Sequence, residues 1–245
     1  MPLLRRQLLQ LLGAASVLAL GACGPAGQPA EPATATPEPT PSPTALLEMA
    51  SKRLLETQTV HFALEVQGDT FIDSGDNIQL LGAEGDLQRP DRVRTVFQAE
   101  VLNRTISLQL VTIGERSWTT NILTGEWGDA PLEFAYRPEI LFSTQDGIGP
   151  VMGRVEDVER LEDENVADRP TYHLRAFVDE SVVGPLTYDT ITGSPVTVDL
   201  WIDRETHDLV RARISEPPGA ERPNPALWTL DLSHHGEALT IEPPV

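Results

Sequence analysis

Apolar side chains recur at every second position along several short stretches of this chain, and this alternation constrains the fold more than any other feature. Successive side chains of a strand point to opposite faces, so each such stretch buries one face only. One-sided burial is typical of antiparallel sheets. The stretches are 59–68, 92–101, 104–114, 165–178, 195–216 and 226–235, and 195–216 has the pattern of a hairpin.

Three segments have a helical pattern instead. Residues 45–58 follow Thr44, which we expect to cap the helix, and place Leu47, Ala50 and Leu54 on one face. Segments 137–155 and 179–192 are less regular but more helical than their surroundings. The order of elements predicts an α+β fold, with a large curved antiparallel sheet, or half-barrel, and helices covering its concave face. Because large twisted sheets curl, we expect an apolar trough beneath those helices.

The N-terminus has the layout of an export signal. Arg5 and Arg6 precede an apolar run from Leu8 to Leu20, which is too short to span a bilayer comfortably. Leu20, two small residues and Cys23, the only cysteine, together resemble a bacterial lipobox. This predicts a signal peptide over 1–22 and a lipid on Cys23, hence an exported protein anchored to the outer face of the cell membrane. The alternatives are an ordinary signal peptide with a chance cysteine and, for the export route, a twin-arginine signal.

Residues 24–44 are rich in proline and carry no bulky apolar side chain, which predicts an unfolded tether. Residues 23–44 therefore form a lipidated cysteine and tether, and 45–245 a single domain. The chain has 18 basic and 37 acidic residues, for a net charge of −19. This field repels nucleic acid and anionic headgroups, so we expect no nucleic-acid partner, and membrane affinity supplied by the lipid anchor.

The order of these features resembles the LppX/LprG-type bacterial lipoproteins, which share the half-barrel fold of the LolA/LolB carriers. The resemblance rests on the lipobox and tether, the helix-to-strand start at 46–68, "TGEWGDAP" (124–131), "ENVADRPTYHLRAFV" (164–178), "VTVDLWIDRETHDLVRARI" (196–214) and the closing "IEPP". One departure is Asp168, where the family usually has glycine.

The resemblance implies a hydrophobic cavity that holds acylated lipids, with no catalytic chemistry. The candidate wall residues are Val60, Phe62, Leu64, Phe97, Leu108, Leu110, Leu200 and Ile202, and the candidate lid residues are Ile140, Leu141, Phe142, Val151 and Met152. The alternative for each is an ordinary packed core, since alternation is the same for a filled and a hollow interior. Trp201 falls on the opposite register, so we do not assign it to the cavity.

Motifs for catalysis or metal binding are weak. Asp73-Ser74-Gly75 matches half of an aspartic-protease site, but that chemistry needs a second carboxylate, and the triplet is also a common turn. His234 and His235 are neighbours on a predicted strand and so point to opposite faces. The acidic segment 155–165 lacks calcium-loop spacing and is expected to be a solvated edge. We predict no enzyme activity, metal or cofactor.

The favoured function is a membrane-anchored lipoprotein that binds or carries lipid or lipidated molecules across the cell envelope. Its partners would be the membrane, an acylated ligand and an envelope transport protein. The alternatives are an envelope sensor that binds a protein partner on the same fold, and a hydrolase with an unrecognised site.

Overall fold

The computed structural model describes residues 40–71, 75–130, 140, 143–187, 189–191, 193–218 and 223–244. Thr40–Val245 cluster into one compact unit. The predicted signal peptide, Cys23 and the tether up to residue 39 lie outside the described residues, as do Asp73 and Ser74. Within the described ranges, no helix combines the length and apolarity that crossing a membrane requires.

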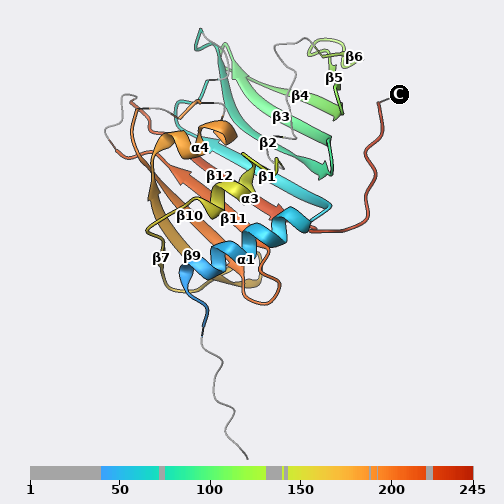
Figure 1. Ribbon diagram of the computed structural model, residues 1–245. Coiled ribbons are helices and arrows are strands. Elements are labelled where there is room, and N and C mark those ends of the chain that lie inside the picture. Colours follow the sequence, from blue (N-terminus) through green and yellow to red (C-terminus); the bar gives the residue numbers. More distant parts are fainter. Residues whose placement is uncertain are drawn as a thin grey trace, which may run out of the picture. The chain divides into compact units, whose positions relative to one another are not determined.

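The described part contains one 12-stranded sheet in which neighbouring strands are antiparallel (Figure 1). Strands β1–β6 form one meander and β9–β12 another, and the two join where β1 pairs with β12. The strands are β1 (Thr59–Gln67), β2 (Ile78–Gln88), β3 (Arg92–Val101), β4 (Arg104–Ile113), β5 (Arg116–Thr120), β6 (Trp127–Asp129), β7 (Glu159–Arg160), β8 (Glu164–Val166), β9 (Arg169–Val178), β10 (Val196–Asp203), β11 (Leu209–Ser215) and β12 (Leu227–Ser233).

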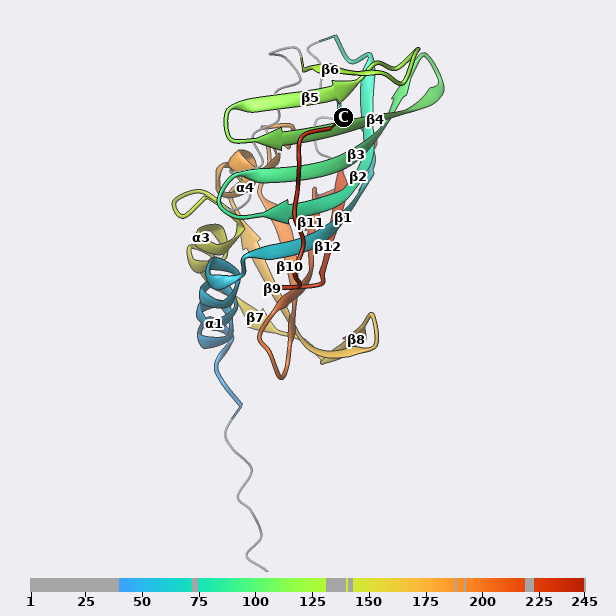
Figure 2. The same ribbon diagram turned by 90° about the vertical axis from the view of Figure 1, so that its right-hand side faces the viewer.

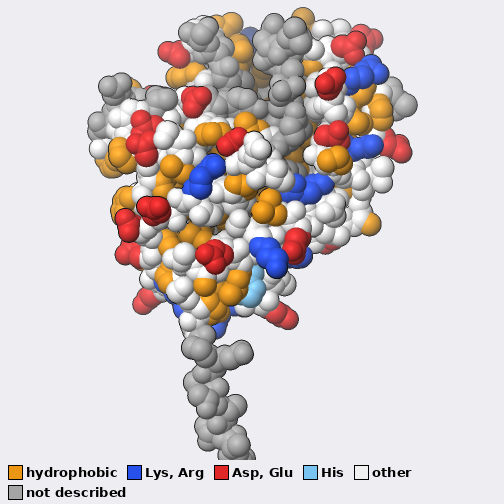
Figure 3. All heavy atoms as spheres, in the orientation of Figure 1, with side chains coloured by type: hydrophobic (Ala, Val, Ile, Leu, Met, Phe, Trp, Pro, Cys, Tyr) orange, Lys and Arg blue, Asp and Glu red, His pale blue; other side chains and the backbone are white. Residues whose placement is uncertain are grey.

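The helices α1 (Pro43–Glu56), α3 (Ile148–Gly153) and α4 (Glu180–Thr187) lie on one side of the sheet. The side view shows that the sheet bends toward them and that β8 lies on the other side (Figure 2). This arrangement confirms the predicted fold class, a large antiparallel half-barrel with helices on its concave face. Over the face drawn in Figure 3, basic side chains are interspersed with acidic and apolar ones.

Helix α1 begins two residues earlier than the sequence pattern predicts. Ser42, not Thr44, is the N-cap, because its hydroxyl accepts a hydrogen bond from the Ala45 amide at 3.2 Å, and Pro43 occupies the first turn. Proline is well placed there, since the first helical amides have no partner within the helix. The folded unit therefore takes in residues that we predicted to belong to the tether.

Strand β2 is absent from the strands predicted by alternation, and its glycines explain why. Gly82 and Gly85 interrupt the apolar pattern, and the register with β3 shifts between Leu80 and Gly82. A Cβ on Gly82 would lie 2.4 Å from the carbonyl oxygen of Leu64, and one on Gly85 would lie 2.1 Å from that of Arg94. The close approach of β2 to both neighbours therefore requires glycine, and glycine adds nothing to an alternating apolar pattern.

The departure from the family pattern at Asp168 fits the local backbone. Ala167 and Asp168 form the two-residue turn between β8 and β9, with φ values of 49° and 62°. Glycine is the residue that adopts this left-handed region most easily, and aspartate is among the few others that visit it. The turn is therefore formed without the family's glycine.

Candidate functional site

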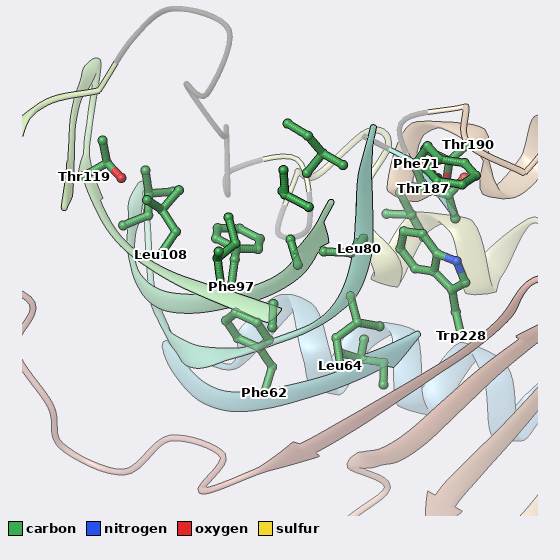
Figure 4. Close-up of a pocket in the computed structure, with 18 of the residues that line it drawn as sticks. Phe62, Leu64, Phe71, Leu80, Phe97, Leu108, Thr119, Thr187, Thr190 and Trp228 are labelled. Atoms are coloured by element: carbon green, nitrogen blue, oxygen red, sulfur yellow. Dashed lines mark hydrogen bonds between the residues drawn. The ribbon is translucent and has the colours of Figure 1, made fainter. Parts of the chain in front are cut away.

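A cavity of about 1630 Å³ lies between the concave face of the sheet and helices α3 and α4. Strands from both meanders contribute to its wall, including β1, β3 and β4 on one side and β10–β12 on the other. Most of the lining is apolar. Figure 4 shows Phe62, Leu64, Phe97 and Leu108 lying around one space, with Trp228 beyond Leu64.

The antiparallel register explains how the wall forms. Phe97 of β3 pairs with Leu108 of β4, and Ala99 pairs with Ile106, so apolar side chains from both strands share one face. Leu64, Phe97 and Leu108 are only partly buried although they lie on the concave side. In a filled core such side chains would be surrounded on every side. Their partial exposure marks a hollow interior.

Most of the predicted wall and lid residues line this cavity, and a few do not. Those that line it are Phe62, Leu64, Phe97, Leu108, Leu110, Val151, Met152 and Leu200. Val60 and Ile202 are 0% exposed, belong to the packed core and are outside the lining. Ile140 is described but does not contribute to the lining, and Leu141 and Phe142 lie outside the described residues.

Packing explains why Val60 differs from Phe62 on the same face of β1. Val60 follows α1 by four residues and is 0% exposed, whereas Phe62, which belongs to the same core cluster, also borders the cavity. Ile202 follows a register shift in the β10–β11 hairpin, and it pairs with the buried Leu209. Both residues therefore fill space that the helix and hairpin close off.

Several lining residues were missed by the sequence analysis. Leu80 belongs to the glycine-interrupted strand β2, and Leu186 to helix α4. Trp228 and Leu230 lie on β12, whose alternation was recognised and could have revealed them. The lining also takes in the β3–β4 and β5–β6 turns, for which strand alternation carries no signal.

Polar groups gather in two parts of the lining. The first comprises Thr119, Thr120, Asn121, Thr124, Glu126 and Asp129, and the second Thr187, Asp189 and Thr190 beside α4. Thr190 donates to the carbonyl oxygen of Thr187 at 2.6 Å, so its hydroxyl is engaged within the protein. Among the described lining residues Arg104 is the only cation, and none is cysteine, histidine, serine or lysine. This composition suits apolar chains attached to a polar group without strong negative charge.

A network of ion pairs connects α1 to the start of β9 and to the turn between β10 and β11. Arg53 of α1 donates to Asp208 at 2.8 Å, and Arg169 donates to Asp208 at 3.0 Å and to Asp203 at 2.8 Å. Burial alone would raise the pKa of Asp208, but hydrogen bonds from Thr206 and the two arginines, with the charge of His235, lower it below its ordinary value. These contacts hold α1 in place against the sheet.

His235 sits beside this network with its ring buried. Its Nε2 lies 3.0 Å from the carbonyl oxygen of Leu209, while its Nδ1 has no hydrogen-bond partner and is 4.0 Å from Asp208. Burial lowers the pKa of His235, and the attraction of Asp208 does not offset it. The neighbouring His234 is exposed, and the described residues contain no group of side chains able to hold a metal ion.

Trp201 lies on the convex face, beneath β8. Its ring stacks on His173 with centroids 4.3 Å apart, and its Nε1 donates to Glu164 at 3.2 Å. His173 lies 2.8 Å from Asp199 and 3.0 Å from Glu164, and Arg175 also donates to Asp199. The acidic residue Glu164 therefore takes part in the hydrogen bonds that hold β8 against the sheet, away from the cavity.

The chain matches a known protein family and has a fold similar to that of solved structures. Residues 42–241 match the family described as LppX_LprAFG lipoprotein. The fold is similar to that of LprF from Mycobacterium bovis, with a TM-score of 0.67 and 20% identity over 84% of this chain and 99% of that one. It is also similar to the lipoprotein LppX from Mycobacterium tuberculosis, with a TM-score of 0.58 and 18% identity over 82% and 100%. The search of curated proteins gave no match.

Proposed function

We propose a lipid-binding function for this chain, which belongs to the LppX_LprAFG lipoprotein family. The match confirms the family that the motifs predict, and membership of a lipoprotein family implies an exported, lipid-anchored protein. Beyond this, we assign the anchor to Cys23 and the role of ligand site to the cavity. The protein would bind or carry a lipid or lipidated molecule across the envelope, and catalysis has no part in the proposal.

The observation that carries the proposal is the cavity itself, at about 1630 Å³ with a mostly apolar lining. At roughly 30 Å³ for a group the size of a methylene or a water molecule, it has room for on the order of 50 such groups. That corresponds to about two or three long acyl chains. Empty apolar space of this size offers little stability to the protein, since side chains beside a void lose packing contacts. A ligand that fills it accounts for its presence.

The mechanism is physical. Each methylene that leaves water for an apolar site is worth about 0.8 kcal/mol, so a sheltered chain can leave a bilayer without exposing its length to solvent. The wall is built from paired strands, which fix Phe97 against Leu108 and hold the space open. A lipid anchor on Cys23 would keep the carrier near its source membrane and raise its local concentration there.

Mass spectrometry of the purified protein tests this proposal. The chain from residue 24 onward retains the whole compact unit Thr40–Val245 and removes the anchor. After detergent-free purification and organic extraction, we expect close to stoichiometric lipid. Leu108→Trp, which projects a larger side chain into the cavity, should lower the amount of bound lipid. Gln109→Trp is the matched control, because Gln109 is exposed and points away from the cavity on the same strand.

Two results would redirect the proposal. A wild-type chain that stays free of lipid, even after incubation with vesicles, contradicts lipid binding. If that chain instead forms a stable crosslinked complex with an envelope protein, the sensor interpretation replaces the carrier. Equal lipid loss in Leu108→Trp and Gln109→Trp would show that the cavity is not the binding site.

A further inference from the structure

Three large apolar side chains at the cavity mouth are exposed to solvent. Leu102 is 85% exposed, Ile122 56% and Leu123 93%, and all three also line the cavity. We call these three residues the rim. Among the described residues, the other exposed large apolar side chains are Met49, Val96 and Phe177, and none of these lines the cavity. Exposed apolar residues in one cluster mark an interaction site, whereas scattered ones are ordinary.

Leu102 occupies a position that favours a different residue. It begins the two-residue turn between β3 and β4, with φ at 49°, followed by Asn103 at 57°. This mirror-image turn prefers asparagine, aspartate or glycine at both positions, because a left-handed backbone crowds a Cβ. A polar residue would also be better solvated. Neither the turn geometry nor solubility accounts for a leucine here.

Ile122 and Leu123 are presented by a turn whose shape is fixed. The side-chain oxygen of Asn121 accepts hydrogen bonds from the amides of Leu123 at 2.8 Å and Thr124 at 3.1 Å. The backbone of Asn121 is also bonded, accepting from the Gly125 amide and donating to Glu126, both at 2.8 Å. The turn therefore projects its two apolar side chains into solvent as a defined structure.

Both turns lie at one end of the sheet. Strand β5 runs antiparallel to β4, with Thr119 opposite Leu110, so the chain leaves β5 toward the end where β4 begins. That end carries the β3–β4 turn with Leu102. Figure 2 shows the two hairpins projecting from the same end of the sheet. Two separate hairpins thus contribute to one apolar rim around one opening.

We infer that the rim docks on the surface of a lipid bilayer, so that the cavity opens directly into it. This inference rests on the proposed function, because the rim residues border the cavity that the proposal assigns to an acyl chain. Contact between rim and bilayer removes the layer of water that the chain would otherwise cross. A bilayer seated on the rim gives an acyl chain a continuous apolar path from the membrane to the cavity.

The charge around the rim indicates which property of the bilayer matters. Arg104 and Glu126 lie beside the rim in the lining and carry opposite charges, and the whole chain carries −19. Attraction to anionic headgroups is therefore not the driving force, and insertion of apolar side chains is. Docking should occur on neutral vesicles and persist at high salt.

The predicted tether is long enough for docking. About 20 residues separate Cys23 from the start of α1 at Pro43, and extended proline-rich chain spans about 3.1 Å per residue, or roughly 60 Å. A compact domain of this size is on the order of 40 Å across. A domain anchored at Cys23 can therefore turn until any part of its surface, the rim included, meets the membrane.

Flotation with phosphatidylcholine vesicles tests the inference, using the chain from residue 24 onward. We expect wild type to float with the vesicles in 0.1 M and 0.5 M NaCl. The triple variant Leu102→Asn, Ile122→Ser, Leu123→Ser should lose at least tenfold in partitioning. Phe177→Ser is the matched control, because Phe177 is 70% exposed away from the cavity, and it should bind as wild type does. Unchanged melting temperatures establish folding, and Leu123→Ser alone, with a smaller loss, replaces the triple if it is unstable.

A second measurement separates this inference from the proposed function. Uptake of a fluorescent fatty acid from solution by the wild type reports the cavity without a membrane, and Phe177→Ser, which lies outside the lining, should keep it within about twofold. The inference is overturned if wild type does not float, if flotation needs anionic lipid and is lost in salt, or if Phe177→Ser loses as much as the rim variant. Failure of fatty-acid uptake in wild type counts against the proposed function instead, whatever the vesicles show.

Discussion

Replacing one leucine of the cavity wall and one of the packed core with alanine should have unequal costs. Leu174 on β9 is 0% exposed and lies in the core cluster, so Leu174→Ala leaves a void. Leucine-to-alanine changes of that kind cost about 3–5 kcal/mol, of which the void contributes about 24 cal/mol per Å³. Leu108 borders space that is already empty and is only partly buried. Leu108→Ala loses transfer free energy alone, about 1–2 kcal/mol.

Urea unfolding of the delipidated protein, followed by far-UV circular dichroism, measures both costs. Equal m-values among the variants would license the comparison of unfolding free energies. Replacing the same two leucines with tryptophan tests whether each site has room for a larger side chain. Leu108→Trp should change stability by less than about 1 kcal/mol, whereas Leu174→Trp overpacks the core and costs about 1–3 kcal/mol or more. If Leu108→Ala costs as much as Leu174→Ala, and Leu108→Trp unfolds the protein, the reasoning from a hollow interior is refuted.

Three further predictions concern the support of the fold. Because burial lowers the pKa of His235 below the unfolded value near 6.5, the unfolded state binds the proton more readily, and stability should fall as pH drops from 7.5 through 6.5. His235→Gln should flatten this slope in equilibrium unfolding between pH 7.5 and 5.5, and an unchanged slope would count against it. Asp208→Asn removes the charge that pairs with Arg169, and because that arginine is partly exposed we expect a loss of about 2 kcal/mol, read from a urea midpoint. Gly85→Val places side-chain atoms against the backbone of Arg94 and should abolish the cooperative thermal transition; a melting temperature within a few degrees of wild type would rule out the close approach.

The sequence predicted the sheet wherever one strand face alternates cleanly. Strand β3 follows its apolar pattern, and α1 is off by only two residues at its start, whereas β10 is buried on both faces. Strand β2 escaped because close contact with both neighbours requires Gly82 and Gly85, and glycine contributes nothing to an alternating pattern. Periodicity reports which face is buried, and it fails where the backbone itself is the contact.

The cavity could be predicted only in part. Val60 and Phe62 have the same local pattern on β1, yet Val60 lies in the filled core and Phe62 borders the cavity. The difference depends on which elements pack around each residue, and that packing is set by contacts far apart in sequence. Trp201 is similar, since its burial depends on β8 and on the stack with His173 rather than on its own strand.

A crystal structure of the protein purified from a host with its bound lipid tests the central claim most directly. We predict continuous density for acyl chains in the space bordered by Phe97, Leu108 and Leu200. After delipidation, the same space should remain open at close to 1630 Å³. A crystal structure in which side chains fill that interior, with no channel wide enough for an acyl chain, would contradict the account.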